Sequence, residues 1–178
     1  MSPRSFVRTN WLLAILLVMT CHLQASEWVQ LSSRGFWFGF DKPEGWTIDY
    51  RSAAQIANFA IHEEGTTWRQ AKAVIFARLI PRKEGETIEE FVSGDVDKFE
   101  ENCPFFEIED LSLDLKGLQK FTVKSYDCPG GRYEIVAVTG TARHFIVFVL
   151  SSARQDTAEA VLEPFKQILT SFMWMETR

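Results

Sequence analysis

Several features are scarce or missing in this sequence, and each absence excludes a class of protein. No stretch reaches the roughly twenty consecutive apolar residues that a membrane-spanning helix needs. Lysine and arginine form no cluster and the net charge is −5, which disfavours nucleic acid as a partner, because neutralising phosphates requires clustered basic residues. Internal repeats, low-complexity tracts and linkers rich in Pro, Gly or Ser are also absent. The chain is therefore expected to hold one folding unit.

The N-terminus has the layout of a secretory signal peptide. Arg4 and Arg8 precede the apolar run Trp11–Cys21, which is too short for a membrane span. Ala25 is a small residue at a suitable cleavage site, so residues 1–25 are predicted to be removed and residues 26–178 to form the mature domain. A mature protein that works outside the cytoplasm, periplasmic or secreted, follows from this layout.

Cys21 leaves a second interpretation of the leader open. A bacterial lipoprotein is cut just before a cysteine that then carries lipid. The residue before such a cysteine is normally small, whereas here Thr20 follows the bulky Met19. The sequence therefore favours an unlipidated product, with membrane association through Cys21 as the alternative.

The other two cysteines, Cys103 and Cys128, are predicted to form a disulfide, because an exported chain meets an oxidising compartment. The segment Asp114–Gly117 has the signature of a type I turn. Folding the chain back about that turn brings positions 103 and 128 to within a residue or two of each other. Two free buried thiols and a redox pair stay as alternatives, although a CxxC spacing is absent.

Apolar patterning predicts a sheet that is covered on both faces. Strands are expected at 35–40, 47–51, 59–63, 73–80, 111–115, 118–127, 133–139 and 144–150. The first two are expected to form a hairpin through the turn Pro43–Gly45. Because Phe145–Leu150 is apolar on both alternating faces, neither face of that strand can be left in water.

Two helices supply the expected cover. Thr87 and Glu90 form a capping box at the start of a helix whose apolar residues recur at three- and four-residue steps. A second helix with a wide apolar stripe ends near Phe172. Pro164 either kinks this helix, the interpretation favoured by the pattern, or lies in the first turn of a new one. The predicted fold class is α+β, a three-layer α/β/α sandwich with a central, mostly antiparallel sheet of six or seven strands.

The sequence resembles the PsbP-like superfamily. The resemblance rests on Phe36–Phe40 leading into Pro43–Trp46, on the helix start Thr87–Phe91 and on the ending Leu162–Leu169, and it spans residues 28–173. The superfamily includes an extrinsic photosystem lumen protein, a yeast nuclear-transport factor and bacterial secreted DcrB-like proteins. The resemblance implies an accessory or binding role, and no functional residue of the family can be matched to a position here.

Residues that could hold a metal or perform catalysis form no recognised arrangement. His62 is followed by Glu63 and Glu64, but a helix with two histidines four residues apart is absent. His144 opens the most apolar strand and is interpreted as a hydrogen-bonded structural residue. The acids most able to gather on calcium lack the loop spacing of a dedicated site; they are Glu107, Glu109, Asp110 and Asp114. No cofactor, metal site or enzymatic activity is predicted.

Tryptophans are the most suggestive candidates for a binding surface, because a surface tryptophan offers a large contact area with one polar group. Those near turns or chain ends are Trp37, Trp46, Trp68 and Trp174. Trp46 is also expected to cap the core, and Trp174 is the leading candidate for an exposed contact. The sequence thus predicts a non-enzymatic envelope protein that binds a protein partner. The alternatives are a small-molecule carrier with an apolar pocket between sheet and helix, and, less favoured, a hydrolase.

Overall fold

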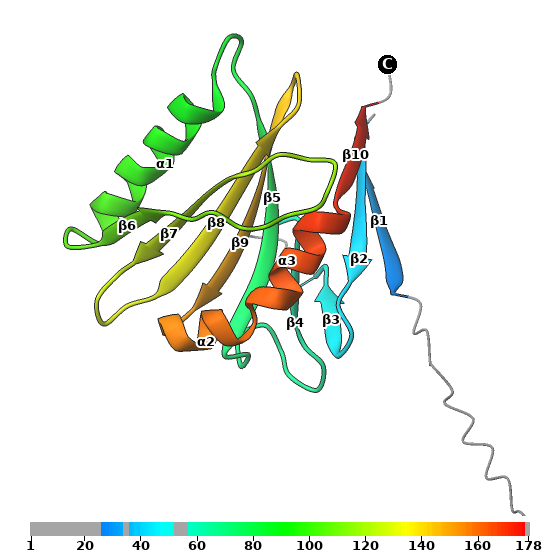
Figure 1. The fold of residues 1–178 in the computed structure, drawn as a ribbon, viewed down its shortest axis with the longest axis horizontal. Coiled ribbons are helices and arrows are strands. Elements are labelled where there is room, and N and C mark those ends of the chain that lie inside the picture. The colour runs from blue at the N-terminus through cyan, green and yellow to red at the C-terminus, as the bar shows by residue number, and fades with distance from the viewer. Residues whose placement is uncertain (1–25, 34–35, 52–56, 177–178) are drawn as a thin grey trace, which may run out of the picture.

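A computed structural model describes residues 26–33, 36–51 and 57–176. The predicted signal peptide and Cys21 lie outside these residues. The described chain forms an α+β fold with two antiparallel sheets, and the central sheet has the predicted seven strands (Figure 1). In spatial order its strands are β3 (Trp46–Asp49), β4 (Phe59–Glu63), β5 (Ala73–Pro81), β9 (His144–Ser152), β8 (Tyr133–Gly140), β7 (Thr122–Asp127) and β6 (Glu107–Asp110).

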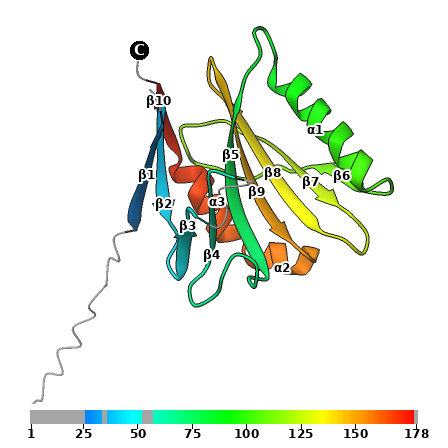
Figure 2. The same cartoon turned by 180° about the vertical axis from the view of Figure 1, so that it is seen from behind.

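A second, three-stranded sheet was not expected from the sequence. Its strands, in spatial order, are β1 (Glu27–Ser33), β2 (Phe36–Lys42) and β10 (Met173–Glu176). The two ends of the described chain therefore lie on either side of β2. Figures 1 and 2 show α3 (Leu162–Ser171) lying between this small sheet and the central one.

Helix α1 (Ile88–Asn102) covers one face of the central sheet, and its predicted capping box is present. The Thr87 hydroxyl accepts from the Glu90 N–H at 3.1 Å, while the Glu90 carboxylate accepts from the Thr87 N–H at 2.8 Å. Phe91 stacks on Phe145 of β9 with ring centroids 4.4 Å apart. This helix thereby buries the face of β9 that carries Phe145, Val147 and Val149, as expected for a strand that is apolar on both faces.

The opposite face is covered by α2 (Gln155–Ala160), α3 and the small sheet together. Phe172, which ends α3, packs edge-on against Phe148 of β9 at 4.9 Å. Phe40 of the small sheet stacks on Phe59 of β4 at 5.3 Å. One apolar core therefore joins both sheets to α3.

No helix in the described ranges is long and apolar enough to cross a bilayer.

The predicted hairpin between residues 35–40 and 47–51 is wrong, although its turn exists. The Trp46 N–H donates to the Pro43 carbonyl at 3.3 Å, and Gly45 adopts φ 74°, a region that favours glycine. However, β2 pairs with β1 and β10, whereas β3 pairs with β4. The turn therefore passes the chain from one sheet to the other.

The predicted strand at 111–115 is also wrong, and the strand expected at 118–127 covers only Thr122–Asp127. After the Leu111 N–H donates to the Val123 carbonyl at 3.0 Å, the chain leaves the sheet until residue 122. Leu111, Leu113 and Leu115 pack on the main core instead, and so does Phe121, whose ring lies 6.2 Å from that of Phe148. Alternating apolar residues here reflect packing over the core, not pairing between strands.

The helix predicted to kink at Pro164 is two helices. The break falls at Val161, and Pro164 is the third residue of α3. Proline fits there because the N–H groups of the first helical turn have no partner within the helix. The second of the two sequence interpretations is the correct one.

Candidate functional site

The outward side of the small sheet carries a cluster of large apolar residues. Residues opposite one another across paired strands share a face, so the register puts Trp37 beside Met175 and Gly39 beside Met173. Trp28 of β1 is on the same side. We call this surface the outer face; it consists of Trp28, Gln30, Ser32, Trp37, Gly39, Asp41, Met173 and Met175.

Gly39 makes room for an indole ring at the centre of the outer face. A Cβ atom built on Gly39 would overlap the Trp28 ring and lie 2.8 Å from the Val29 carbonyl oxygen. Trp28 can therefore lie flat across the sheet only because position 39 has no side chain. This arrangement presents the ring of Trp28 in a defined position.

Much of the outer face is open to solvent. Met175 is 52% exposed, Trp28 41% and Met173 39%, and Trp37 is half-buried. Exposed large apolar residues that are grouped on one surface mark interaction sites more often than isolated ones do. Methionine adapts its shape to a partner and tryptophan supplies a rigid contact area. The outer face therefore combines the two kinds of side chain that suit protein recognition.

Of the four tryptophans predicted as a binding surface, the structure places only Trp37 on the outer face. Trp46 is 5% exposed and belongs to the main core, so it offers no surface for binding. Trp174 points inward from β10, stacks on Phe36 at 6.2 Å and donates from Nε1 to the Gln119 side chain at 3.1 Å. The residues exposed on β10 are its neighbours Met173 and Met175.

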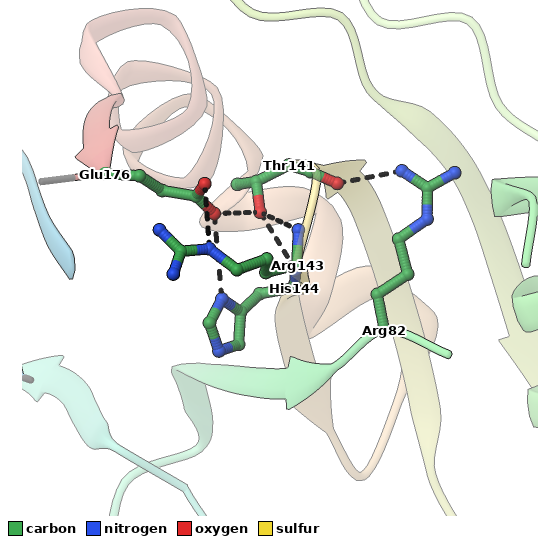
Figure 3. Close-up of polar contacts among 5 residues, drawn as sticks. All are labelled: Arg82, Thr141, Arg143, His144 and Glu176. Carbon is green, nitrogen blue, oxygen red and sulfur yellow. Dashed lines mark hydrogen bonds and ion pairs between the residues drawn. The ribbon is translucent and has the colours of Figure 1, made fainter. Parts of the chain in front are cut away.

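A polar cluster fixes β10 to the central sheet (Figure 3). The Thr141 hydroxyl donates to Glu176 Oε1 at 2.6 Å and accepts the N–H groups of Arg143 and His144 at 3.1 and 2.9 Å. Arg143 Nε lies 3.4 Å from Glu176 Oε2. These contacts, the Thr141 hydrogen bond first, lower the pKa of Glu176 below its ordinary value. The cluster anchors the strand that carries Met173 and Met175.

His144 takes part in that cluster through proximity to Glu176. Its Nδ1 lies 3.8 Å from Glu176 Oε1, beyond hydrogen-bond distance. Its ring packs against Phe36 at 5.5 Å. The surroundings are those of a structural residue beside the β8–β9 turn, although the expected hydrogen bond from its ring is not made within the described chain.

A separate cleft of about 450 Å³ opens on the face of the central sheet that carries α1. Its floor is Ala60, Val74 and Phe76, from β4 and β5, and Trp68 forms a wall from the loop between these strands. None of its lining residues belongs to α1. The alternative prediction placed an apolar pocket between sheet and helix, whereas this cleft occupies the part of the sheet that the helix leaves uncovered.

One buried acid lies in this cleft. Glu134 of β8 accepts from the Ser151 hydroxyl at 3.1 Å and lies 3.4 Å from Arg132 Nε. Burial raises the pKa of Glu134 above its ordinary value, and the Arg132 charge and the Ser151 hydrogen bond offset only part of that rise. The carboxylate therefore already has two partners within the protein.

The disulfide between Cys103 and Cys128 is present, with Cα atoms 6.0 Å apart. It joins the residue that caps the C-terminus of α1 to the residue after β7. The geometric reason differs from the expected one, because no turn at Asp114–Gly117 pairs these segments. Strands β6 and β7 pair in a register that puts Glu107 opposite Asp127.

Within the described residues, no group of three or more His, Cys, Asp or Glu side chains converges to hold a metal ion. Of the acids considered for calcium, Glu107, Glu109 and Asp110 are exposed on β6. Asp114 is exposed in the loop that follows this strand. His62 is buried, and its Nδ1 lies 3.1 Å from the Glu63 carbonyl and 3.2 Å from the Thr66 hydroxyl.

Solved structures of other proteins have a similar fold. Cyanobacterial PsbP (CyanoP) from Synechocystis aligns with a TM-score of 0.52 and 15% identity, over 85% of this chain and 95% of CyanoP. The fold is PsbP-like. LpqN of Mycobacterium tuberculosis, described as involved in cell envelope biogenesis, aligns with a TM-score of 0.53 and 14% identity, over 84% of this chain and 91% of LpqN. A mutant form of the protein Mog1 aligns with a TM-score of 0.52 and 10% identity, over 84% of this chain and 95% of Mog1.

At these identities the PsbP-like likeness establishes the fold and assigns no site. No protein-family model matches the chain, and no curated protein matches its sequence. The outer face therefore has to be judged on its own geometry. Sequence reasoning missed Trp28, Met173 and Met175 as members of one surface, because it assigned no strand to residues 26–33 or 173–176. In a strand, Trp28 and Gln30 lie on one face and Val29 and Leu31 on the other. Because both pairs contain a large apolar residue, the sequence does not show which face meets water.

Proposed function

We propose that this protein is a non-enzymatic, extracytoplasmic binding module that docks a protein partner on its outer face. The observation that carries the proposal is the exposed group Trp28, Trp37, Met173 and Met175, held on a sheet whose third strand is anchored by Glu176. The acidic chain, with a net charge of −5, favours a partner surface that has an apolar centre and a basic rim.

Export is supported by the signal-like leader and by the disulfide, since such bonds persist in oxidising compartments. LpqN, which shares the fold, is described as involved in cell envelope biogenesis, and the same setting suits this chain. Among PsbP-like proteins we place it, as part of this proposal, with the bacterial secreted DcrB-like members.

Photo-crosslinking in the native envelope tests the docking surface. A photoreactive residue at position 175 is expected to capture a reproducible protein partner, identified by mass spectrometry. Trp28→Ser should abolish this capture, because loss of a central tryptophan anchor costs about 2 kcal/mol or more, roughly a thirtyfold fall in affinity.

Leu118→Ser is the matched control, since Leu118 is 82% exposed but lies on the loop between β6 and β7. This variant should keep the crosslink and the fold. Equal loss of capture in both variants, or no captured protein at all, would contradict the proposal.

A further inference from the structure

The cleft beside α1 has the size and composition of a small-molecule site. Its volume of about 450 Å³ lies within the range of roughly 300–1,000 Å³ that such sites occupy. Val74 and Phe76 are only half-buried, although the floor they form is apolar. Apolar side chains left in a concave surface with a few polar groups around them favour a ligand with an apolar body.

Trp68 has an unsatisfied polar group at this cleft. Its Nε1 is shielded from solvent and has no hydrogen-bond partner within the described residues. A buried donor without an acceptor costs free energy, so most such groups in proteins are paired with protein, water or ligand. Since solvent does not reach Nε1, a ligand in the open cleft would contact the indole ring of Trp68 and not this N–H.

Positive charge predominates around the cleft. Lys72 lines it and makes no ion pair within the described chain, and Arg69 lies over the Trp68 ring at 5.5 Å. Glu134 is the one acid among the lining residues, and Arg132 and Ser151 already contact its carboxylate. A cationic ligand would therefore meet an occupied carboxylate and an unpaired lysine, whereas an anion would meet the exposed ammonium group of Lys72.

We propose that this cleft binds a small amphiphilic carboxylate, with its apolar body on Val74, Phe76 and the Trp68 ring and its carboxylate near Lys72. The site is separate from the outer face, and neither Trp28 nor the β10 methionines line it. The protein would then carry or sense an organic acid in addition to docking a partner.

A matched ligand series tests the proposal on the protein in the form that the cell accumulates. Decanoate, decan-1-ol and decylamine have the same chain and differ in head-group charge. Titration followed by NMR of the tryptophan indole N–H signals, with the Trp68 signal assigned through Trp68→Phe, is expected to show saturable movement of that signal with decanoate. Decanol should bind more weakly and decylamine least.

Two variants test the placement of the ligand. Lys72→Ala should weaken decanoate binding about two- to fivefold, as expected for one exposed charge contact, while Lys120→Ala, which removes a lysine elsewhere, should not. Val74→Trp fills the floor and should abolish binding, with circular dichroism used to confirm that the variant is folded.

The proposal is overturned if decylamine binds as well as decanoate, if the Trp68 signal stays still, or if decanoate moves the Trp28 and Trp37 signals instead. The Trp28→Ser variant should keep decanoate binding, and Lys72→Ala should keep the protein crosslink. Failure of either proposal can therefore be told from failure of the other.

Discussion

At the scale of single residues, Glu134 shows how burial and pairing compete at one carboxylate. Its pKa is raised because the loss of hydration outweighs the Arg132 charge and the Ser151 hydrogen bond. A carboxyl group whose pKa is higher in the folded than in the unfolded state stabilises the fold most below its unfolded value, about 4.3. That stabilisation is lost as the pH rises through the folded-state pKa. The ionised Glu134 carboxylate therefore lowers the free energy of unfolding at neutral pH.

The variant Glu134→Gln is expected to be more stable than the wild type at pH 7, because the amide keeps an acceptor for Ser151 without the buried charge. The advantage should shrink towards pH 4, where the wild-type carboxyl is protonated. Urea unfolding followed across this pH range measures the difference. Glu109→Gln, at an exposed position of β6, is the matched control for loss of one negative charge. A Gln variant that is less stable at pH 7 than at pH 4, relative to wild type, would show that pairing outweighs burial.

At the scale of elements, the disulfide ties α1 to β7 at the end of the helix furthest from its capping box. The Cys103 N–H caps the helix by donating to the Phe99 carbonyl at 2.9 Å, and Phe99 packs on Tyr126 of β7 at 4.9 Å. The covalent link and the aromatic pair thus hold the same two elements together. Contacts in the same cluster keep α1 over the β7–β8–β9 part of the sheet and leave the cleft beside it uncovered.

Replacing both Cys103 and Cys128 with alanine is expected to lower the free energy of unfolding by about 3.5 kcal/mol, the chain-entropy value for cysteines that are 25 residues apart. Urea denaturation with and without reductant measures the loss. Reductant should destabilise the wild type by a similar amount and leave the double variant unchanged. A wild type that is insensitive to reductant under unfolding conditions would mean that the bond contributes little.

At the scale of the whole molecule, the two sheets are joined by a shared core and so are expected to unfold together. Phe38 of β2 contacts Phe59 of the central sheet at 5.9 Å and Phe172 at the end of α3 at 6.0 Å. Within a single core, loss of one large side chain is felt by every layer that packs on it. The small sheet therefore shares one core with the central sheet.

Phe38→Ala should lower the global free energy of unfolding by about 3–5 kcal/mol. Hydrogen exchange should then rise in β4 and β5 as well as in β1, β2 and β10. Trp37→Ala, the neighbouring change on the opposite side of β2, should cost much less because its side chain faces outward. If exchange rises only in the small sheet, that sheet unfolds as an independent unit.

Much of this architecture is predictable from local patterns. The capping box at Thr87 and Glu90 is a contact between residues three apart, so the sequence alone contains both partners. The apolar run Phe145–Leu150 requires cover on both faces wherever it lies, and the strands β4, β5, β8 and β9 follow from short apolar runs bounded by turn residues. The disulfide follows from the expectation that a chain with this leader is exported to an oxidising compartment, where its two remaining cysteines would pair.

The sequence by itself thus determined the elements whose cause is local and the need for a two-sided core. Only the tertiary structure decided that β2 leaves its sequence neighbour β3 and pairs with β1 and β10, because strand pairing depends on which segments meet in space. The folded arrangement also directs Trp46 and Trp174 towards the core and puts Trp28, Met173 and Met175 on one face of the small sheet. Burial is a property of the folded surface, and a tryptophan's own neighbours in sequence do not specify which side of a sheet will meet the core.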